Sequence, residues 1–200
     1  MLGPERRLWD AEARRFDDEP DHGLADPATR AAWRTLLLGV LPGAPARIVD
    51  LGCGTGTLSV LLAQEGYDVT GLDFSPAMVA RARTKAEAAG VSLDLVVGDA
   101  NRPGLPTNSF DVVLSRHVLW AMHDPVLALR RWVDLLGPEG LLLLVEGRWH
   151  TGAGLTAAET EALVLATGRT AQVRAMSEPV YWGGETGDER YLVVSRRRTQ

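Results

Sequence analysis

A glycine-rich turn placed directly after a short apolar run constrains the fold of this 200-residue chain more than any other feature. The run Arg47–Leu51 leads into Gly52, Gly54 and Gly56, and a helical pattern follows over Leu58–Gln64. A strand, a glycine turn and a helix in this order are typical of the ligand-binding unit of open α/β sheets. Because glycine has no Cβ atom, a ligand can approach its main chain closely. The turn therefore predicts a binding site at the start of this helix.

Strand-like and helical segments alternate over the following hundred residues. Apolar runs typical of buried strands lie at residues 67–72, 93–97, 111–114 and 141–145. Helix starts are indicated by Ser75-Pro76 and Asp124-Pro125, and Gly90 indicates a helix end. We expect the Gly-Pro-Glu-Gly sequence at residues 137–140 to form a turn. Because consecutive parallel strands need a helix-length crossover, the pattern predicts an α/β, doubly wound, mostly parallel sheet.

The two ends of the chain depart from this alternation. Residues 155–167 have a helical pattern, whereas residues 171–177 and 190–196 are strand-like with no helix between them. We expect these two strands to pair as an antiparallel hairpin at a sheet edge, joined through residues 179–187. Residues 8–41 predict two helices around a polar linker at 17–26. The expected organisation is a single domain, with N-terminal helices that form a lid over residues 1–45 and a core over residues 46–200.

Charge, hydropathy and cysteine content narrow the classes of function. With 21 basic and 26 acidic residues, the net charge of −5 gives no electrostatic reason to bind nucleic acid or an anionic membrane. No apolar stretch approaches the roughly 20 residues of a membrane span, and the N-terminus lacks the apolar region of a secretory signal. A single cysteine, Cys53, excludes a disulfide framework and a cysteine-based zinc site. We expect a cytoplasmic monomer or homodimer with no nucleic-acid, membrane or metal partner.

Two acidic residues indicate what kind of ligand the glycine turn would bind. Asp73 ends the second predicted strand, 17 residues after Gly56, where a carboxylate can accept hydrogen bonds from a ribose diol. A turn or capping role before Ser75-Pro76 is the alternative for Asp73. Asp50 precedes the first glycine by two residues, where it would repel a pyrophosphate but suit an ammonium group. The alternative for Asp50 is hydrogen bonding to the amides of the turn alone. The third glycine also comes one residue too early for the Gly-x-Gly-x-x-Gly pattern of dinucleotide binding.

Five segments, in order along residues 46–146, resemble the motifs of one known family. They are residues 49–56, 71–78, 98–100, 110–115 and 136–142. Together they resemble the class I S-adenosylmethionine-dependent methyltransferases, of the type 11-like, small-molecule branch. Glu139 stands where the commoner residue of the last motif is glycine. The resemblance implies a Rossmann-like, seven-stranded sheet that ends in the antiparallel hairpin.

The resemblance also implies S-adenosylmethionine as the cofactor and S-adenosylhomocysteine as its product. It places the glycine turn against the methionine and ribose parts of the cofactor, with Asp50 near the amino group and Asp73 on the ribose hydroxyls. Phe74 and Met78 would flank the adenine, which Asp99 and Ala100 would hydrogen-bond. The implied cofactor residues are Asp50, Gly52, Cys53, Gly54, Gly56, Asp73, Phe74, Met78, Asp99, Ala100, Ser115, Arg116 and Phe16. For Cys53, packing alone is the alternative.

The acceptor side of the site is less specific. His117 follows the fourth strand, and it is the candidate base or substrate-orienting group, because a neutral imidazole can take a proton near pH 7. Its alternative is packing beneath the loop. Candidate substrate residues are His22, Trp120, Arg148, Trp149, Tyr181 and Trp182.

These features predict an enzyme that transfers a methyl group from S-adenosylmethionine to an O, N or C nucleophile of a small-molecule acceptor. Such a transfer is an in-line displacement that depends mainly on positioning. A general base is needed only where the nucleophile carries a proton that must leave. Two alternatives stay open: an NAD(P)-dependent oxidoreductase, and a non-catalytic, cofactor-binding regulator with the same fold.

Overall fold

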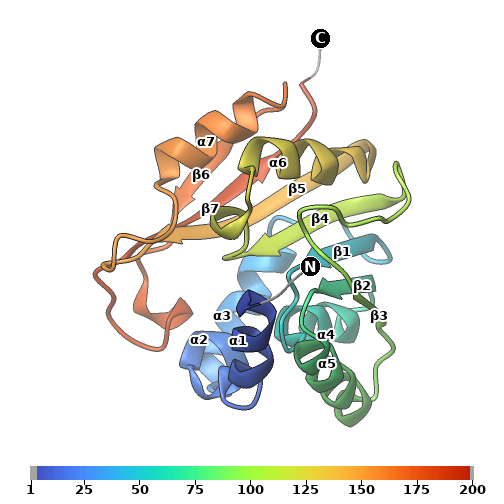
Figure 1. Ribbon diagram of the computed structural model, residues 1–200, viewed down its shortest axis with the longest axis vertical. Helices are drawn as coiled ribbons and strands as arrows, with labels where there is room; N and C mark the ends of the chain where they lie inside the picture. The colour runs from blue at the N-terminus through green and yellow to red at the C-terminus, as the bar shows by residue number, and fades with distance from the viewer. Residues whose placement is uncertain (1–3, 199–200) are drawn as a thin grey trace.

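The computed structural model describes residues 4–198 and contains one seven-stranded sheet (Figure 1). The strands are β1 (Arg47–Leu51), β2 (Asp68–Asp73), β3 (Asp94–Val97), β4 (Phe110–Arg116), β5 (Leu136–Arg148), β6 (Gln172–Ala175) and β7 (Glu189–Ser195). Their order across the sheet is β3-β2-β1-β4-β5-β7-β6. Only β7 runs antiparallel to its neighbours, β5 and β6. The predicted doubly wound, mostly parallel sheet with a C-terminal antiparallel hairpin is confirmed.

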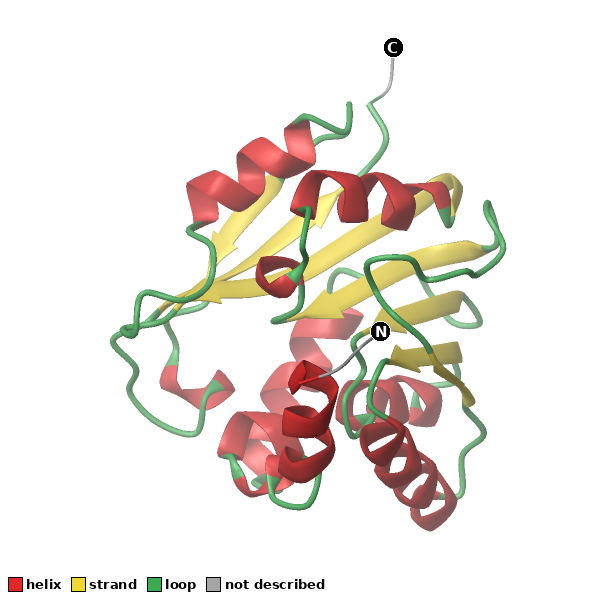
Figure 2. Ribbon diagram, in the orientation of Figure 1, coloured by secondary structure: helices red, strands yellow, loops and turns green. Residues whose placement is uncertain are grey.

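Helices cover both faces of the sheet (Figure 2). They are α1 (Pro4–Glu12), α2 (Pro20–Gly23), α3 (Pro27–Leu38), α4 (Thr57–Gln64), α5 (Pro76–Ala89), α6 (Pro125–Asp134) and α7 (Ala157–Leu165), with short 3₁₀ turns η1 (Phe16–Asp18), η2 (Leu119–Ala121) and η3 (Pro179–Tyr181). One hydrophobic core joins α3, α4 and η3 to the sheet, and the other joins α6 and α7 to its opposite face. Burial on both faces explains why the central strands are continuous apolar runs.

The helix boundaries follow the capping residues found in the sequence. Ser75 accepts a hydrogen bond from the Met78 backbone N–H, and Gly90 ends the same helix in the left-handed conformation. Asp124 caps α6 in the same way as Ser75 caps α5. The N-cap and proline signals thus place both helices correctly.

Three local expectations were wrong. β3 is an edge strand whose Val97 side chain is 51% exposed, not a buried strand, because no further strand covers its outer side. Residues 137–140 do not end one element and begin another. They lie inside β5 as an irregularity, since Phe110 pairs with Leu136 while Val112 pairs with Leu141. The polar linker at 17–26 is itself partly helical, because it contains η1 and α2.

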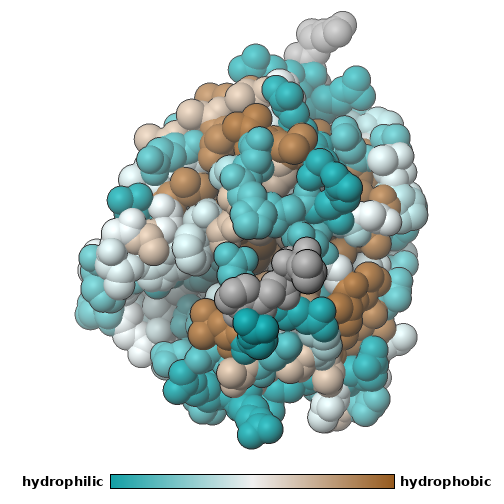
Figure 3. Space-filling model, in the orientation of Figure 1, coloured by the Kyte–Doolittle hydropathy of each residue, from teal (hydrophilic) through white to brown (hydrophobic). Residues whose placement is uncertain are grey.

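The surface mixes polar and apolar residues (Figure 3). An apolar area lies over α6 and α7, where Leu127 and Leu165 are exposed. Within residues 4–198, no helix has both the length and the hydrophobicity that crossing a membrane requires.

Candidate functional site

The glycine turn lies at the carboxyl end of β1, and all three of its glycines are left-handed, with φ of 74° at Gly52, 55° at Gly54 and 75° at Gly56. A Cβ atom at Gly52 would collide with Val118, and one at Gly56 would lie 2.7 Å from the Ala82 side chain. Glycine is therefore required at these two positions by both conformation and packing. The N–H groups of residues 52 and 53 donate to the carbonyl of residue 72, at 2.7 and 3.0 Å, which ties the turn to β2.

Asp73 ends β2 and faces this turn. One carboxylate oxygen accepts a hydrogen bond from the Gly54 N–H (2.9 Å), and the other accepts one from the Ser75 N–H (2.8 Å). Burial raises the pKa of Asp73, and the two N–H donors oppose that rise. The turn role before Ser75 therefore exists, whereas the residue that caps α5 is Ser75 itself. The turn role does not exclude the ribose role, because each carboxylate oxygen can accept a second hydrogen bond; the ribose role stays a prediction.

Asp50 lies in β1, two residues before Gly52, and its side chain is buried. Its partner is the Ser59 hydroxyl of α4, which donates at 2.7 Å, and no backbone N–H of the described residues donates to it. The alternative of bonding to turn amides is therefore wrong. Burial raises the pKa of Asp50 to about 6, while the Ser59 hydroxyl and the Arg116 charge oppose the rise.

The remaining side chains predicted to hold the cofactor differ in burial and in the contacts that they already make within the protein. Cys53 packs toward Gly71 of β2, and burial raises its pKa well above the ordinary value, so its contacts fit the packing alternative. Met78 is buried and Phe74 half-buried. Asp99 accepts two hydrogen bonds from Asn101, at 2.8 and 2.9 Å. These cofactor roles stay predictions.

Two further predicted cofactor residues are fixed by the core. The carbonyl of buried Ala100 accepts a hydrogen bond from the Trp132 indole (2.8 Å), whereas no hydrogen bond is seen at its N–H. Ser115 donates its hydroxyl to the Leu51 carbonyl (3.2 Å) and is fully buried. The Ser115 side chain therefore connects β4 to β1 and is engaged within the sheet.

Arg116, at the end of β4, is a cation without a carboxylate partner. Its guanidinium donates to the Asp21 carbonyl (2.7 Å) and lies 5.1 Å from the centre of the Trp33 ring. Burial lowers its pKa, and no ion pair to Arg116 occurs among residues 4–198. A guanidinium carries five donors, so Arg116 retains hydrogen-bonding capacity for a ligand.

His117 adopts a left-handed backbone, with φ of 59°, which is uncommon for a residue other than glycine. Its N–H donates to the Val145 carbonyl (2.8 Å). The ring packs edge-on against Trp149, with centres 5.2 Å apart, and is roughly parallel to Trp182 at 6.0 Å. Burial and the charge of Arg116 lower its pKa well below the ordinary value, so the ring is neutral.

Comparison with known proteins relates residues 49–144 to a family of domains. Residues 49–144 match the family model described as a methyltransferase domain. The chain is 38% identical over 98 residues to a ubiquinone biosynthesis O-methyltransferase of Azorhizobium caulinodans, which is 49% of this chain and 39% of the relative. It is 37% identical over 117 residues to a demethylmenaquinone methyltransferase of Thermus thermophilus, 57% of this chain and 53% of the relative. The chain thus spans about half, or less, of these curated relatives.

A solved structure of magnesium protoporphyrin IX methyltransferase from Synechocystis PCC 6803, with bound S-adenosylmethionine, has a TM-score of 0.68. It is 20% identical and covers 85% of this chain and 78% of that one, which shows a shared fold. Residues 49–144 therefore resemble the methyltransferase domain, and the curated methyltransferases named above are 37–38% identical over the aligned residues. The family resemblance found in the five motifs is thereby confirmed.

Residues 16–24, which belong to the predicted lid and are called the lid segment here, contact the glycine turn. The Phe16 ring lies over Gly54, 3.4 Å from the position of an added Cβ. Asp17 accepts hydrogen bonds from the Thr55 hydroxyl (2.5 Å) and from Lys85 of α5 (3.0 Å). Lys85, the one lysine of the sequence, also donates to the hydroxyls of residues 55 and 57. The lid segment is therefore fastened to both the turn and α5.

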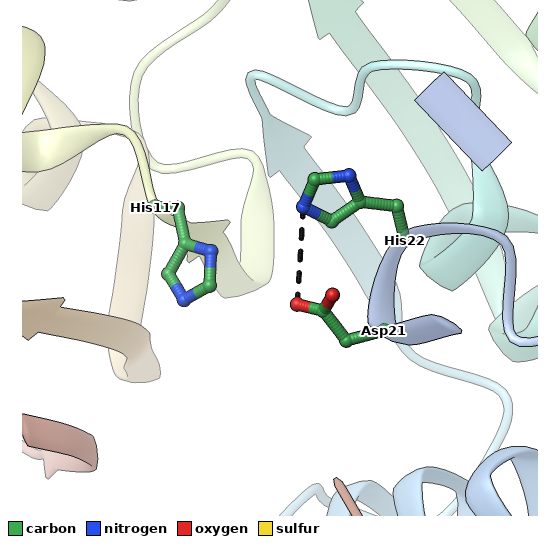
Figure 4. A group of neighbouring side chains, drawn as sticks. All are labelled: Asp21, His22 and His117. Carbon is green, nitrogen blue, oxygen red and sulfur yellow. Dashed lines mark ion pairs between the residues drawn. The ribbon is translucent and has the colours of Figure 1, made fainter. Parts of the chain in front are cut away.

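His22 lies on the lid segment and faces His117 across the site (Figure 4). Its ring stacks on Phe16 with centres 4.2 Å apart, and its Nε2 lies 3.8 Å from the Asp21 carboxylate. Burial lowers the pKa of His22, and the Asp21 charge opposes the change. Asp21, His22 and His117 bring one nitrogen or oxygen each within 4.8 Å of one another. The charge of nearby Arg116 opposes a metal cation at this position, and the expectation of no metal stays a prediction.

The aromatic residues among the predicted substrate residues lie together in the structure, whereas Arg148 lies apart from them. Trp149 contacts both His117 and Trp120, the latter with ring centres 5.3 Å apart. Tyr181 and Trp182 pack edge-on against Trp33, and Trp182 also faces His117. Arg148 does not join this group, because it is exposed and donates to the Gly154 carbonyl (3.1 Å).

Two site residues were missed in the sequence. Arg190 of β7 lies 5.0 Å from the ring centres of both Trp149 and Trp182, pairs with Asp188 at 2.8 Å, and contacts His117. Nothing in the local pattern of a terminal strand indicates that role. Glu146 is fully buried at the end of β5, and an acid directly after an apolar run was a visible signal of burial.

Proposed function

We propose that this chain binds S-adenosylmethionine and transfers its methyl group to a nucleophilic atom of a small-molecule acceptor. The observation that carries the proposal is the left-handed glycine turn at the end of β1, with the Asp73 carboxylate of β2 facing it. The curated relatives are named for ubiquinone biosynthesis and for demethylmenaquinone, which supports a small acceptor. The family match favours this function over the NAD(P)-dependent oxidoreductase alternative.

The residues present fit the amino-acid part of such a cofactor. Arg116 offers buried donors without a carboxylate partner, which suits the carboxylate of the ligand. Asp50 lies close enough to Arg116 for the guanidinium charge to oppose the rise in the pKa of Asp50, so one acid and one cation stand together at the ends of β1 and β4. A ligand with one ammonium and one carboxylate group complements this pair.

When bound, the cofactor supplies a methyl group on a sulfonium, and its leaving thioether needs no proton. The chain then has to orient the acceptor and exclude water. A lid would exclude water from the site. The position of Phe16 over Gly54 and the hydrogen bond from Lys85 to Asp17 support such a lid. We infer that the N-terminal residues 1–45 form the lid and that residues 46–200 form the core.

Calorimetry with S-adenosylhomocysteine, S-adenosylmethionine and NAD tests the proposal. We expect saturable binding of the first two and none of NAD. Asp73→Asn should weaken binding of S-adenosylhomocysteine at least tenfold, because a tenfold change corresponds to about 1.4 kcal/mol, the size of one good hydrogen bond. Asp94→Asn, at an exposed position of β3, is the matched control and should bind normally. Binding of NAD alone would overturn the proposed function.

A further inference from the structure

The hydrogen-bond partners of two facing histidines fix which ring nitrogen of each carries a proton. His22 Nδ1 lies 3.2 Å from the Phe16 carbonyl oxygen, which can only accept. Nδ1 of His22 therefore carries the proton, and in the neutral ring its Nε2 is an unprotonated acceptor. Burial lowers the pKa of His22, which keeps the ring neutral near pH 7.

His117 has the opposite partner and so presents the opposite group. Its Nε2 lies 3.2 Å from a guanidinium nitrogen of Arg190, which can only donate. Nε2 of His117 therefore accepts, and the proton of the neutral ring is on Nδ1. Figure 4 shows that this ring side faces His22 and Asp21. The accepting nitrogen of His117, the candidate base or orienting group of the sequence analysis, is thus already engaged by Arg190.

One ring nitrogen of each histidine lies within 4.8 Å of the other, and Figure 4 shows Nδ1 of His117 and Nε2 of His22 on the sides that face each other. The two histidines thus leave one donor and one acceptor on opposite sides of the site. The donor belongs to the core at the end of β4, and the acceptor belongs to the lid segment. A cavity of about 340 Å³ is lined by Asp21, which lies 3.8 Å from His22, and by Arg190, which contacts His117, together with Glu19, Pro20 and Trp182; neither histidine lines it. A small molecule in that cavity has room for its body beside the pair.

We propose that this pair recognises a hydroxyl acceptor, with His22 Nε2 as the general base and the His117 Nδ1–H as the donor that orients the oxygen. This inference rests on the proposed function and names its substrate class. A hydroxyl oxygen has two lone pairs, so one accepts from His117 while the other attacks. A neutral amine has a single lone pair, which the same donor would block.

The reaction balances without a further reactant. The acceptor oxygen forms a bond to the methyl carbon, while the carbon–sulfur bond breaks and its electron pair stays on the sulfur. The O–H bond breaks, and its proton moves to Nε2 of His22. The resulting imidazolium lies 3.8 Å from the Asp21 carboxylate, an opposite charge that stabilises it.

Nitrogen NMR on protein labelled at histidine and loaded with S-adenosylhomocysteine tests the inference. We expect His22 and His117 both to be neutral with the proton on Nδ1 at pH 7.5. Catechol should shift the signals of both residues, whereas its dimethyl ether and 1,2-diaminobenzene should leave His22 Nε2 unchanged. His123→Gln, which removes an exposed histidine outside the pair, assigns the remaining signals and serves as the control.

Turnover gives an independent readout of the same idea. His22→Gln should lower the rate of catechol methylation about 100-fold, the usual size of a general-base effect, and leave the affinity for S-adenosylhomocysteine within twofold. A proton on His22 Nε2, or a response to the diamine but not to catechol, overturns the inference while cofactor binding stands. If the wild-type protein does not bind S-adenosylhomocysteine, the proposed function itself is overturned.

Discussion

Glu146 should make the stability of the fold fall as the pH rises through neutrality. Its side chain is fully buried at the end of β5, where Oε1 accepts from the N–H groups of Val118 (3.0 Å) and Leu119 (2.8 Å). Its other oxygen, Oε2, is buried with no hydrogen-bond partner. Burial raises the pKa of Glu146 from 4.5 to about 8, although the two N–H donors oppose the rise. The carboxyl group is therefore protonated in the folded protein at pH 7.

The direction of the effect follows from this raised pKa. The folded state holds the proton up to about pH 8, whereas the unfolded chain releases it near pH 4.5, so the contribution to stability is full below 4.5 and lost as the pH approaches 8. One pKa unit corresponds to about 1.4 kcal/mol. Between pH 6.5 and 8 the contribution of Glu146 to the free energy of unfolding should fall by about 1–2 kcal/mol, because the carboxyl group is half ionised at pH 8.

This pH window separates Glu146 from the other buried groups. Asp50 has its pKa raised only to about 6, so its loss of stability is complete at lower pH. His22 and His117 have lowered pKa values, so they contribute stability that is present above the unfolded value of 6.5 and lost as the pH falls below it. Their effect has the opposite sign and overlaps the lower edge of the window, because half of the unfolded rings are protonated at pH 6.5. The two rings together add about 1 kcal/mol between pH 6.5 and 8, so the difference in slope between wild type and Glu146→Gln isolates the effect of Glu146.

Urea denaturation at 25 °C between pH 6.5 and 8 measures the effect. Glu146→Gln keeps one oxygen to accept from the N–H groups of residues 118 and 119, cannot ionise, and should remove the contribution of Glu146 to the slope. Glu87→Gln, at an exposed position of α5, should retain it. An equal slope in wild type and in Glu146→Gln would refute the reasoning.

Two other substitutions test the turn and the lid. Gly56→Ala adds a Cβ 2.7 Å from that of Ala82 at φ +75°, and should cost about 2–4 kcal/mol in urea denaturation, whereas Gly90→Ala, at φ +66° in open space, should cost about 1 kcal/mol. Equal losses would rule out the packing argument. Lys85→Met removes the fastening of Asp17 and should lower the free energy of unfolding by about 1–3 kcal/mol while speeding amide exchange in the lid segment. Unchanged exchange there would show that Lys85 does not hold the lid.

The alternation of strands and helices could be predicted from the sequence because the signals for helix boundaries are local. Ser75-Pro76, Asp124-Pro125 and Gly90 satisfy backbone groups only a few residues away, so each determines a helix boundary by itself. The exposure of β3 is different, because an edge position depends on the order of strands across the whole sheet. The irregularity in β5 could not be predicted for the same reason. Whether residues 137–140 form a true turn or an irregular part of a strand depends on their pairing with β4, which the local sequence does not contain.

The candidate site shows the same limit more strongly. Gly52, Gly54 and Gly56 were identifiable because the turn is one continuous segment. The setting of His117 was not, because its partner Arg190 lies 73 residues further along the chain, on a strand that the sequence describes only as apolar. A spacing pattern can place a histidine near a ligand, but only the contacts decide which of its nitrogens carries the proton.

Completion of the site depends on the lid segment, and this links cofactor binding to acceptor binding. Phe16 covers Gly54 and stacks on His22, so the residue over the glycine turn and the proposed base are neighbours on one segment. That segment is held to the turn by Asp17, through Thr55 and Lys85. A ligand that displaces Phe16 from the turn must also move His22 relative to His117. If the lid segment moves as one unit, we expect the donor and acceptor for the hydroxyl to be aligned only after the cofactor has bound, so that cofactor binding precedes acceptor binding.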